Sequence, residues 1–204
     1  MKLFSKAKTK QSGNQPVIIV SGLPRSGTSM MMRMLAEGGL PVLTDELRRA
    51  DDDNPAGYFE LEVVRQLKEG NVAWLERANG KAVKVISALL EYLPGNYQYK
   101  IIFMERDPRE MLASQKKMLD HRDQTSKLSD DEMEQQFQTH LAAMKPWLVR
   151  QPNMDLLFVN YNGLLAAPEL SCERIMEFLG LPLNQTRMLA VPDKQLYRNR
   201  LVET

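Results

Sequence analysis

One segment near the start of the chain constrains its fold more than any other. The apolar run 17–21 leads into the loop GLPRSGTS at residues 22–29, and a helical pattern begins at residue 28. A strand, a glycine-containing loop and a helix in this order place backbone amides at the start of the helix, where they point at an anion. We therefore expect a phosphate-binding loop at the edge of a sheet. The alternative is a turn without a ligand, because glycine and serine are common in turns.

The loop lacks one residue of the nucleotide-binding P-loop. The spacing from Gly22 to Gly27 matches G-x-x-x-x-G-K-[ST], but Thr28 occupies the position of the lysine, while Ser29 keeps the hydroxyl. That lysine reaches the terminal phosphates of a nucleoside triphosphate, so its loss argues against ordinary ATP or GTP chemistry. Arg25, inside the loop, supplies a different cation that can bind two oxygens of a tetrahedral anion.

Composition limits the class of protein. The 204 residues are 43% hydrophobic and 26% charged, which is typical of a globular chain. We expect a disordered basic tail at residues 1–15 and a single domain at 16–204. No apolar run has the length of a membrane span, and the lysine-rich start does not resemble a secretory signal, so we expect a cytoplasmic protein. A net charge of +1, without basic and aromatic residues interleaved, argues against nucleic acid as a partner.

Apolar runs of strand length alternate with helical patterns along the chain. This alternation favours an α/β fold of three layers, with a central, mainly parallel five-stranded sheet flanked by helices, as in P-loop proteins. The strands are expected at residues 17–21, 41–44, 82–86, 100–105 and 156–161. The helices are expected near residues 28–37, 61–78, 87–93, 108–119, 130–149 and 168–179.

A second informative segment is KIIFMERDPREMLAS at residues 100–114. It places Arg106 at the carboxyl end of a buried strand, where open α/β sheets bind ligands. Ser114 follows about two turns into the next helix. Asp107 and Glu110 are placed as the cap and the closing acid of that helix start. Taken alone, Arg106 could instead pair with a neighbouring acid, and Ser114 could be an ordinary surface residue.

Taken together, the two segments resemble the signatures of sulfotransferases that use 3′-phosphoadenosine 5′-phosphosulfate (PAPS). The family's Pro-[Lys/Arg]-x-Gly-Thr-[Ser/Thr] loop grips the 5′-phosphosulfate, and PRSGTS at residues 24–29 fits it at each position. Its second signature is an Arg, then Asp-Pro, then a Ser eight residues after the Arg, and that Arg and Ser hold the 3′-phosphate. The last strand of the family ends in a Tyr near the adenine. The resemblance covers about residues 17–200, and the donor-binding residues it implies are Arg25, Ser26, Gly27, Thr28, Ser29, Arg106, Ser114 and Tyr161.

The resemblance implies transfer of a sulfuryl group from PAPS to a hydroxyl or amine, without a metal ion. The acceptor could be a small molecule, a carbohydrate or a lipid, and the sequence gives neither its identity nor the oligomeric state. The basic segment 194–200 resembles one that closes over the 3′-phosphate in the family. Two other interpretations remain open at this point: a P-loop-type nucleotide kinase, and a phosphoadenosine-binding protein without catalysis.

The catalytic base is the point at which the chain departs from the cytosolic branch of the family. That branch places a His two residues after a Lys on the third strand, whereas this chain has Lys84 followed by Ile86. The departure favours a glutamate. Glu46 follows the second expected strand, as the base of protein-tyrosine sulfotransferases does, and Glu60 ends the bacterial-type motif NPAGYFE at residues 54–60. The sequence favours Glu46, and the implied catalytic residues are Glu46, Glu60, Lys84 and Arg25; His121 and His140 are expected at the surface.

Overall fold

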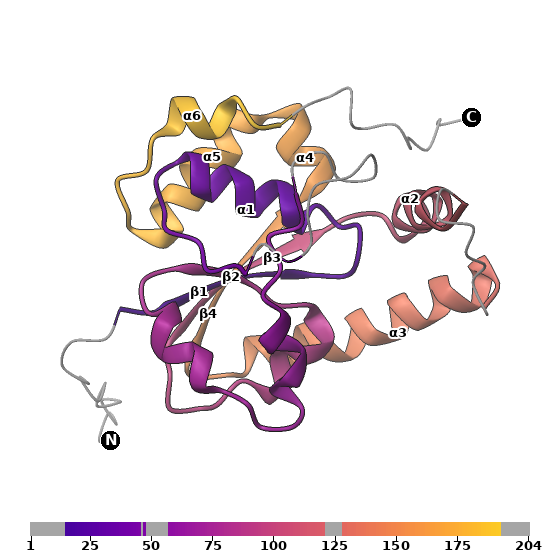
Figure 1. Ribbon diagram of the computed structural model, residues 1–204. Coiled ribbons are helices and arrows are strands. Elements are labelled where there is room, and N and C mark those ends of the chain that lie inside the picture. The colour runs from indigo at the N-terminus through magenta and orange to yellow at the C-terminus, as the bar shows by residue number, and fades with distance from the viewer. Residues whose placement is uncertain (1–14, 46, 48–56, 121–127, 193–204) are drawn as a thin grey trace, which may run out of the picture.

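A parallel sheet separates two layers of helices (Figure 1). The computed structural model describes residues 15–45, 47, 57–120 and 128–192. Within these ranges the sheet has the strand order β2-β1-β3-β4, and every neighbouring pair is parallel. The strands are β1 (Val17–Gly22), β2 (Ala82–Lys84), β3 (Tyr99–Glu105) and β4 (Met154–Asn160). The three-layer α/β fold predicted from the sequence is therefore confirmed.

Helices cover both faces of the sheet. The upper layer in Figure 1 contains α1 (Thr28–Glu37), α4 (Tyr161–Ala166), α5 (Pro168–Leu179) and α6 (Gln185–Leu189). The lower layer contains α3 (Asp130–Val149) and three 3-10 helices, η1 (Glu62–Leu67), η2 (Ala73–Ala78) and η3 (Ser87–Tyr92). The remaining helix, α2 (Pro108–Asp120), lies beyond the end of β3 and packs against α3. None of the helices in the described ranges has both the length and the apolar character needed to cross a bilayer.

Alternation along the strands builds a core on each face. Side chains of consecutive strand residues point to opposite faces of a sheet. Val17 and Ile19 of β1 accordingly join the core beneath η1, η2, η3 and α3, whereas Ile18 and Val20 join the core beneath α1, α4, α5 and α6. Because both faces are covered, β1 is buried along its whole length, which is typical of a parallel sheet.

The prediction of a strand at residues 41–44 was wrong. The segment makes one isolated parallel bridge, between Val42 and Ala82, at the free edge of β2. Two hydrogen bonds hold it there, from Ala82 N to Pro41 O (2.9 Å) and from Leu43 N to Ala82 O (2.9 Å). Pro41 has no amide hydrogen to extend the ladder. The described sheet therefore has four strands rather than five.

The helix predicted at residues 61–78 is also different in the structure. Two 3-10 helices, η1 and η2, replace it, and between them Gly70 takes φ of 80°, which ends a right-handed helix. Two short helices, α4 and α6, were not predicted. Each begins at an asparagine whose side chain accepts a backbone N–H: Asn160 from Gly163 (2.8 Å) and Asn184 from Arg187 (3.0 Å).

The strand order creates a switch point between β1 and β3. The chain leaves β1 through α1 toward β2, and it leaves β3 through α2 and α3 toward β4, on the other side. Connections that diverge in this way open a crevice at the carboxyl ends of the two strands, which is where open α/β sheets bind ligands. The loop after β1 and Arg106 after β3 both lie at this crevice.

Candidate active site

The loop after β1 is pressed tightly against its neighbours. A Cβ atom at Gly22 would lie 2.5 Å from the Ser26 hydroxyl and 2.7 Å from the Met104 carbonyl oxygen, so only glycine fits there. Gly27, at the N-cap of α1, has φ of 98°, and Arg25 has φ of 67°, an uncommon conformation for a residue with a side chain. The hydroxyl of Ser26 is buried and has no hydrogen-bond partner among the described residues. This hydroxyl lies beside Gly22, on the inner side of the loop.

Arg25 and Ser114 meet, although they lie on different elements. Arg25 Nε donates to Ser114 Oγ at 2.9 Å, which joins the loop to α2. Arg106, at the end of β3, donates from Nη1 to the carbonyl oxygen of Arg25 at 3.2 Å. The structure thus brings together, at the edge of the sheet, three of the residues that the sequence predicted to bind the nucleotide.

The Arg106 side chain is almost completely enclosed, with 7% of its surface exposed. Its Nε donates to Glu110 Oε2 at 3.0 Å, and its guanidinium carbon lies 4.4 Å from the centre of the Tyr161 ring. Tyr161 begins α4 and is buried; it lies against the loop, because a Cβ atom at Gly27 would come within 2.4 Å of its ring. Tyr161 therefore contacts both the loop and Arg106.

Glu110 was expected only to close the helix cap. Its carboxylate instead accepts from Arg106 through Oε2 and from Asn162 Nδ2 through Oε1, at 3.2 Å. The cap of α2 is completed by Asp107, whose side chain accepts from the Arg109 backbone at 2.8 Å. Glu110 follows Arg106 by only four residues, so the ion pair is local enough to have been considered from the sequence. No local signal pointed to Asn162.

A second cluster lies on the β2 side of the loop. Lys84 Nζ donates to Ser29 Oγ at 3.0 Å and to the Tyr58 carbonyl oxygen at 2.9 Å, and it lies 3.8 Å from Glu60 Oε1. The Lys84 side chain is 12% exposed and that of Glu60 is 26% exposed. Three polar groups therefore meet at one point: a lysine from the sheet, a hydroxyl from the start of α1 and a carboxylate.

Of the two candidate bases, the structure places only Glu60. The two residues before Glu46 contact the backbone of Glu60: Thr44 Oγ1 donates to the Glu60 carbonyl oxygen at 2.8 Å, and Asp45 N donates to the same oxygen at 3.3 Å. Glu46 lies outside the described residues, as do His121, the tail at residues 1–14 and the basic segment 194–200. Glu60 Oε2 also lies 3.4 Å from Arg65 Nη2.

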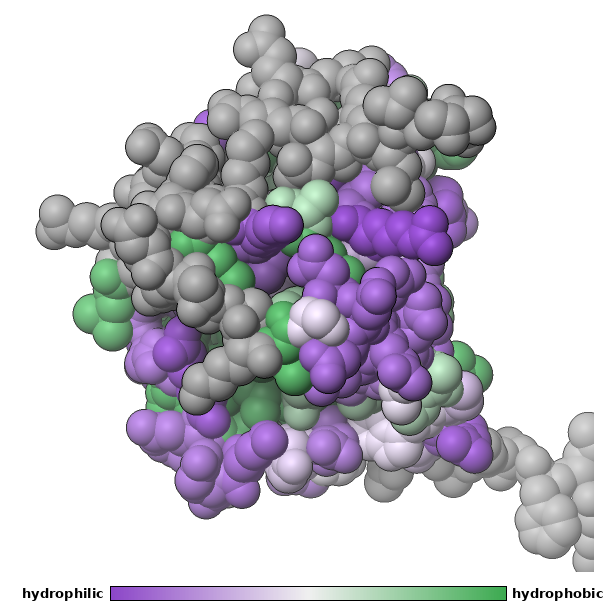
Figure 2. Space-filling view, turned by 90° about the vertical axis from the view of Figure 1, so that its right-hand side faces the viewer, coloured by the Kyte–Doolittle hydropathy of each residue, from purple (hydrophilic) through white to green (hydrophobic). Residues whose placement is uncertain are grey.

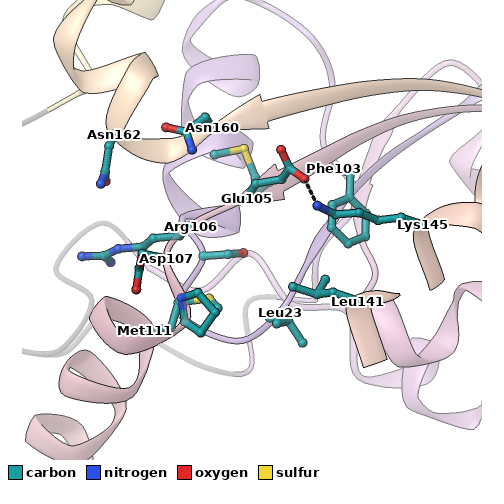
Figure 3. Close-up of a pocket in the computed structure, with 13 residues that line it drawn as sticks. Leu23, Phe103, Glu105, Arg106, Asp107, Met111, Leu141, Lys145, Asn160 and Asn162 are labelled. Carbon is teal, nitrogen blue, oxygen red and sulfur yellow. Dashed lines mark ion pairs between the residues drawn. The ribbon is translucent and has the colours of Figure 1, made fainter. Parts of the chain in front are cut away.

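A cavity of about 430 Å³ adjoins the cluster, beneath the carboxyl end of β3 and between α2 and α3 (Figure 3). Lys145 of α3 reaches across it to form an ion pair with Glu105. The cavity also touches Ser26 and Arg106, and its other lining residues are Leu23, Phe103, Met104, Asp107, Pro108, Met111, Leu141, Asn160 and Asn162. Figure 2 shows the face of the molecule onto which the strand ends open, where hydrophilic side chains gather around a smaller apolar area.

His140 lies on α3 and contacts Ser87 of η3, with 2.9 Å between Nε2 and Oγ. Burial lowers the pKa of His140 below its ordinary value, and the nearby Glu91 carboxylate offsets part of that shift. His140 is half-buried, where α3 meets η3. Across the described part of the chain, no group of three or more His, Cys, Asp or Glu side chains could hold a metal ion.

Comparison with known proteins identifies a family. A sequence model described as "Sulfotransferase family" matches residues 56–185, which is more than half of the chain. The match begins after the loop at residues 22–29, so the loop is an observation independent of it. No curated protein matches the sequence significantly.

Solved structures share the fold. The sulfotransferase domain of the Synechococcus PCC 7002 olefin synthase is similar at 17% identity and a TM-score of 0.56, covering 96% of this chain and 92% of that one. Mouse sulfotransferase SULT7A1, complexed with PAP, is similar at 16% identity and a TM-score of 0.57, covering 88% of this chain and 62% of that one. At these identities the likeness concerns the fold.

Proposed function

The chain belongs to the sulfotransferase family, and on that premise we propose that it transfers the sulfuryl group of PAPS to a hydroxyl or amine acceptor. The observation that carries the proposal is the meeting of Arg25, Arg106 and Ser114 at the switch point of the sheet. The complex of the mouse relative with PAP, which is adenosine 3′,5′-bisphosphate, supports a donor with phosphates at both positions of the ribose.

Each donor-binding residue has a role in this proposal. The loop amides and the start of α1, with Arg25, Thr28 and Ser29, bind the 5′-phosphosulfate, since amides and a helix start favour an anion. Arg106 and Ser114 bind the 3′-phosphate, and Tyr161 lies against the base. PAPS supplies the sulfuryl group and a phosphate leaving group.

The Lys84 cluster is the proposed transfer point. Lys84 holds Ser29 at the start of α1 and faces Glu60, so a sulfuryl oxygen beside Ser29 would meet a positive charge. A carboxylate next to that point can take the proton of the attacking hydroxyl or amine. The distance of 3.8 Å between Glu60 Oε1 and Lys84 Nζ supports Glu60 for this role, and Glu46, which the sequence favours, is the other candidate. The acceptor is a small molecule, a carbohydrate or a lipid.

Nucleotide binding tests the donor without knowledge of the acceptor. We expect adenosine 3′,5′-bisphosphate to raise the melting temperature, and ADP and ATP to leave it nearly unchanged. Arg106→Ala or Ser114→Ala should weaken binding of the bisphosphate about 10- to 100-fold, because a hydrogen bond to a charged group contributes about 1.5–3 kcal/mol. Arg109→Ala is the matched control, since Arg109 lies on α2, as Ser114 does, and 69% of its side chain is exposed.

Equal stabilisation by ADP and the bisphosphate would contradict the assignment of the 3′-phosphate. Transfer of labelled sulfate from PAPS to a panel of hydroxyl and amine acceptors then separates an enzyme from a protein that only binds the nucleotide. Binding without transfer to any acceptor would favour the non-catalytic interpretation.

A further inference from the structure

Glu110 is a buried acid inside a cluster otherwise suited to anions. Only 3% of it is exposed, and it lies in the first turn of α2. Its two carboxylate oxygens accept from Arg106 Nε and from Asn162 Nδ2, so it ties the end of β3 to the start of α4. A negative charge here weakens the attraction of the site for any anion. Its presence needs a reason other than affinity.

The contacts of Arg106 supply that reason. Glu110 holds Nε, the Arg25 carbonyl oxygen holds Nη1, and the Tyr161 ring supports the face of the guanidinium. The plane of the guanidinium is thereby fixed before any ligand arrives. A guanidinium that is already oriented loses little conformational entropy when a ligand binds. It forms good hydrogen bonds only with a ligand whose oxygens lie in line with its N–H groups.

We propose that Glu110 is a positioning residue that gives the site its selectivity for nucleotides bearing a phosphate on the ribose 3′ position. This inference rests on the proposed function, because it assumes that Arg106 binds that phosphate. Glu110 does not touch the nucleotide. Its charge lowers the affinity of the site for anions in general, while its hydrogen bond fixes the direction of the Arg106 donors. The site therefore binds the bisphosphate more tightly than ADP.

The neighbouring amide allows charge and geometry to be separated. Asn162 Oδ1 is buried and has no hydrogen-bond partner among the described residues. In Glu110→Gln, rotation of the Asn162 amide would let this oxygen accept from the new glutamine amide, while the glutamine oxygen still accepts from Arg106. Glu110→Gln therefore removes the charge and can keep both hydrogen bonds, whereas Glu110→Ala removes both.

The experiment measures dissociation constants of adenosine 3′,5′-bisphosphate and of ADP by calorimetry for the wild type and both variants. We expect Glu110→Ala to weaken the bisphosphate about tenfold, in line with the loss of a hydrogen bond to a charged group, and to leave ADP unchanged or slightly tighter. Glu110→Gln, which can keep both hydrogen bonds, should leave the ratio of the two affinities near the wild-type value. Glu37→Gln is the matched control, because Glu37 forms an ion pair with Arg187 (2.8 Å) away from the site.

A purely structural role of Glu110 predicts a different result. Glu110→Ala would then melt earlier while the ratio of the two affinities stayed at the wild-type value, and this would overturn the proposal. If circular dichroism shows that Glu110→Ala does not fold, Asn162→Ala decides: it should lower the ratio about threefold, and an unchanged ratio refutes the inference. A wild type that binds ADP as tightly as the bisphosphate refutes the proposed function itself.

Discussion

The ring of Tyr161 lies against the backbone of Gly27, so that a Cβ atom at Gly27 would sit 2.4 Å from Cδ2 and 2.9 Å from Cε2 of the ring. The same ring supports the guanidinium of Arg106. One aromatic side chain thus contacts both the loop after β1 and the arginine after β3.

Gly27→Ala should therefore destabilise the protein by about 2–4 kcal/mol, from backbone strain together with overlap with the ring. Gly39→Ala is a close control, because Gly39 has φ of 96°, against 98° at Gly27, and a Cβ atom there would meet no other atom within 4 Å. It should cost only about 1–2 kcal/mol, from strain alone. Urea unfolding measures both. Equal losses would mean that the Tyr161 contact contributes nothing, and in a Tyr161→Ala background we expect the two losses to converge.

Glu60→Gln should lower kcat for sulfuryl transfer about 100-fold or more, since a general base contributes about 10²- to 10⁴-fold. Binding of adenosine 3′,5′-bisphosphate should be unchanged, because Glu60 is not among the residues proposed to hold the nucleotide. The measurement is transfer of labelled sulfate to whichever acceptor the panel identifies. Glu62→Gln, an exposed neighbour that also pairs with Arg65 (3.1 Å), is the control. A loss confined to Glu46→Gln would assign the base to Glu46 instead.

Lys84→Met should separate transfer from binding. Its ammonium group contacts Ser29 beside the proposed sulfuryl position, whereas the bisphosphate product carries no sulfuryl group. We expect kcat to fall about tenfold or more, from the loss of a charge at the transfer point, while the dissociation constant of the bisphosphate changes less than about threefold. Lys81→Met, just before β2, should change neither. If Lys84→Met weakened the bisphosphate as strongly as it lowered kcat, Lys84 would belong to the nucleotide site.

Stability should fall on acidification because of His140. Burial lowers its pKa in the folded state below the ordinary value of 6.5, so the unfolded chain binds the proton more readily. The contribution is complete above pH 6.5 and is lost as the pH falls from there through the lower folded-state pKa. Urea unfolding between about pH 5 and pH 8 should show a steeper decline for the wild type than for His140→Gln. Identical slopes would show that His140 titrates alike in both states.

The local parts of the fold were predictable because their causes are local. Helices α1, α3 and α5 have the predicted bounds. Ser129 and Glu132 form a capping box at the start of α3, and Gly180 takes φ of 67° at the end of α5. By contrast, the pairing of residues 41–44 with β2 and the break of the 61–78 helix depended on tertiary packing. A short apolar segment at a sheet edge has the same local pattern whether or not it extends the ladder.

The candidate site likewise has features that the sequence could predict and features that depend on tertiary packing. By itself, the sequence determined the phosphate-type loop, the absence of its lysine, and the spacing from Arg106 to Ser114, because these are properties of neighbouring residues. Only the tertiary structure decided that Arg25 bonds to Ser114, that Lys84 faces Ser29 and Glu60, and that Glu110 also accepts from Asn162. Such contacts join residues from separate elements, and their geometry follows from how the elements pack around the sheet.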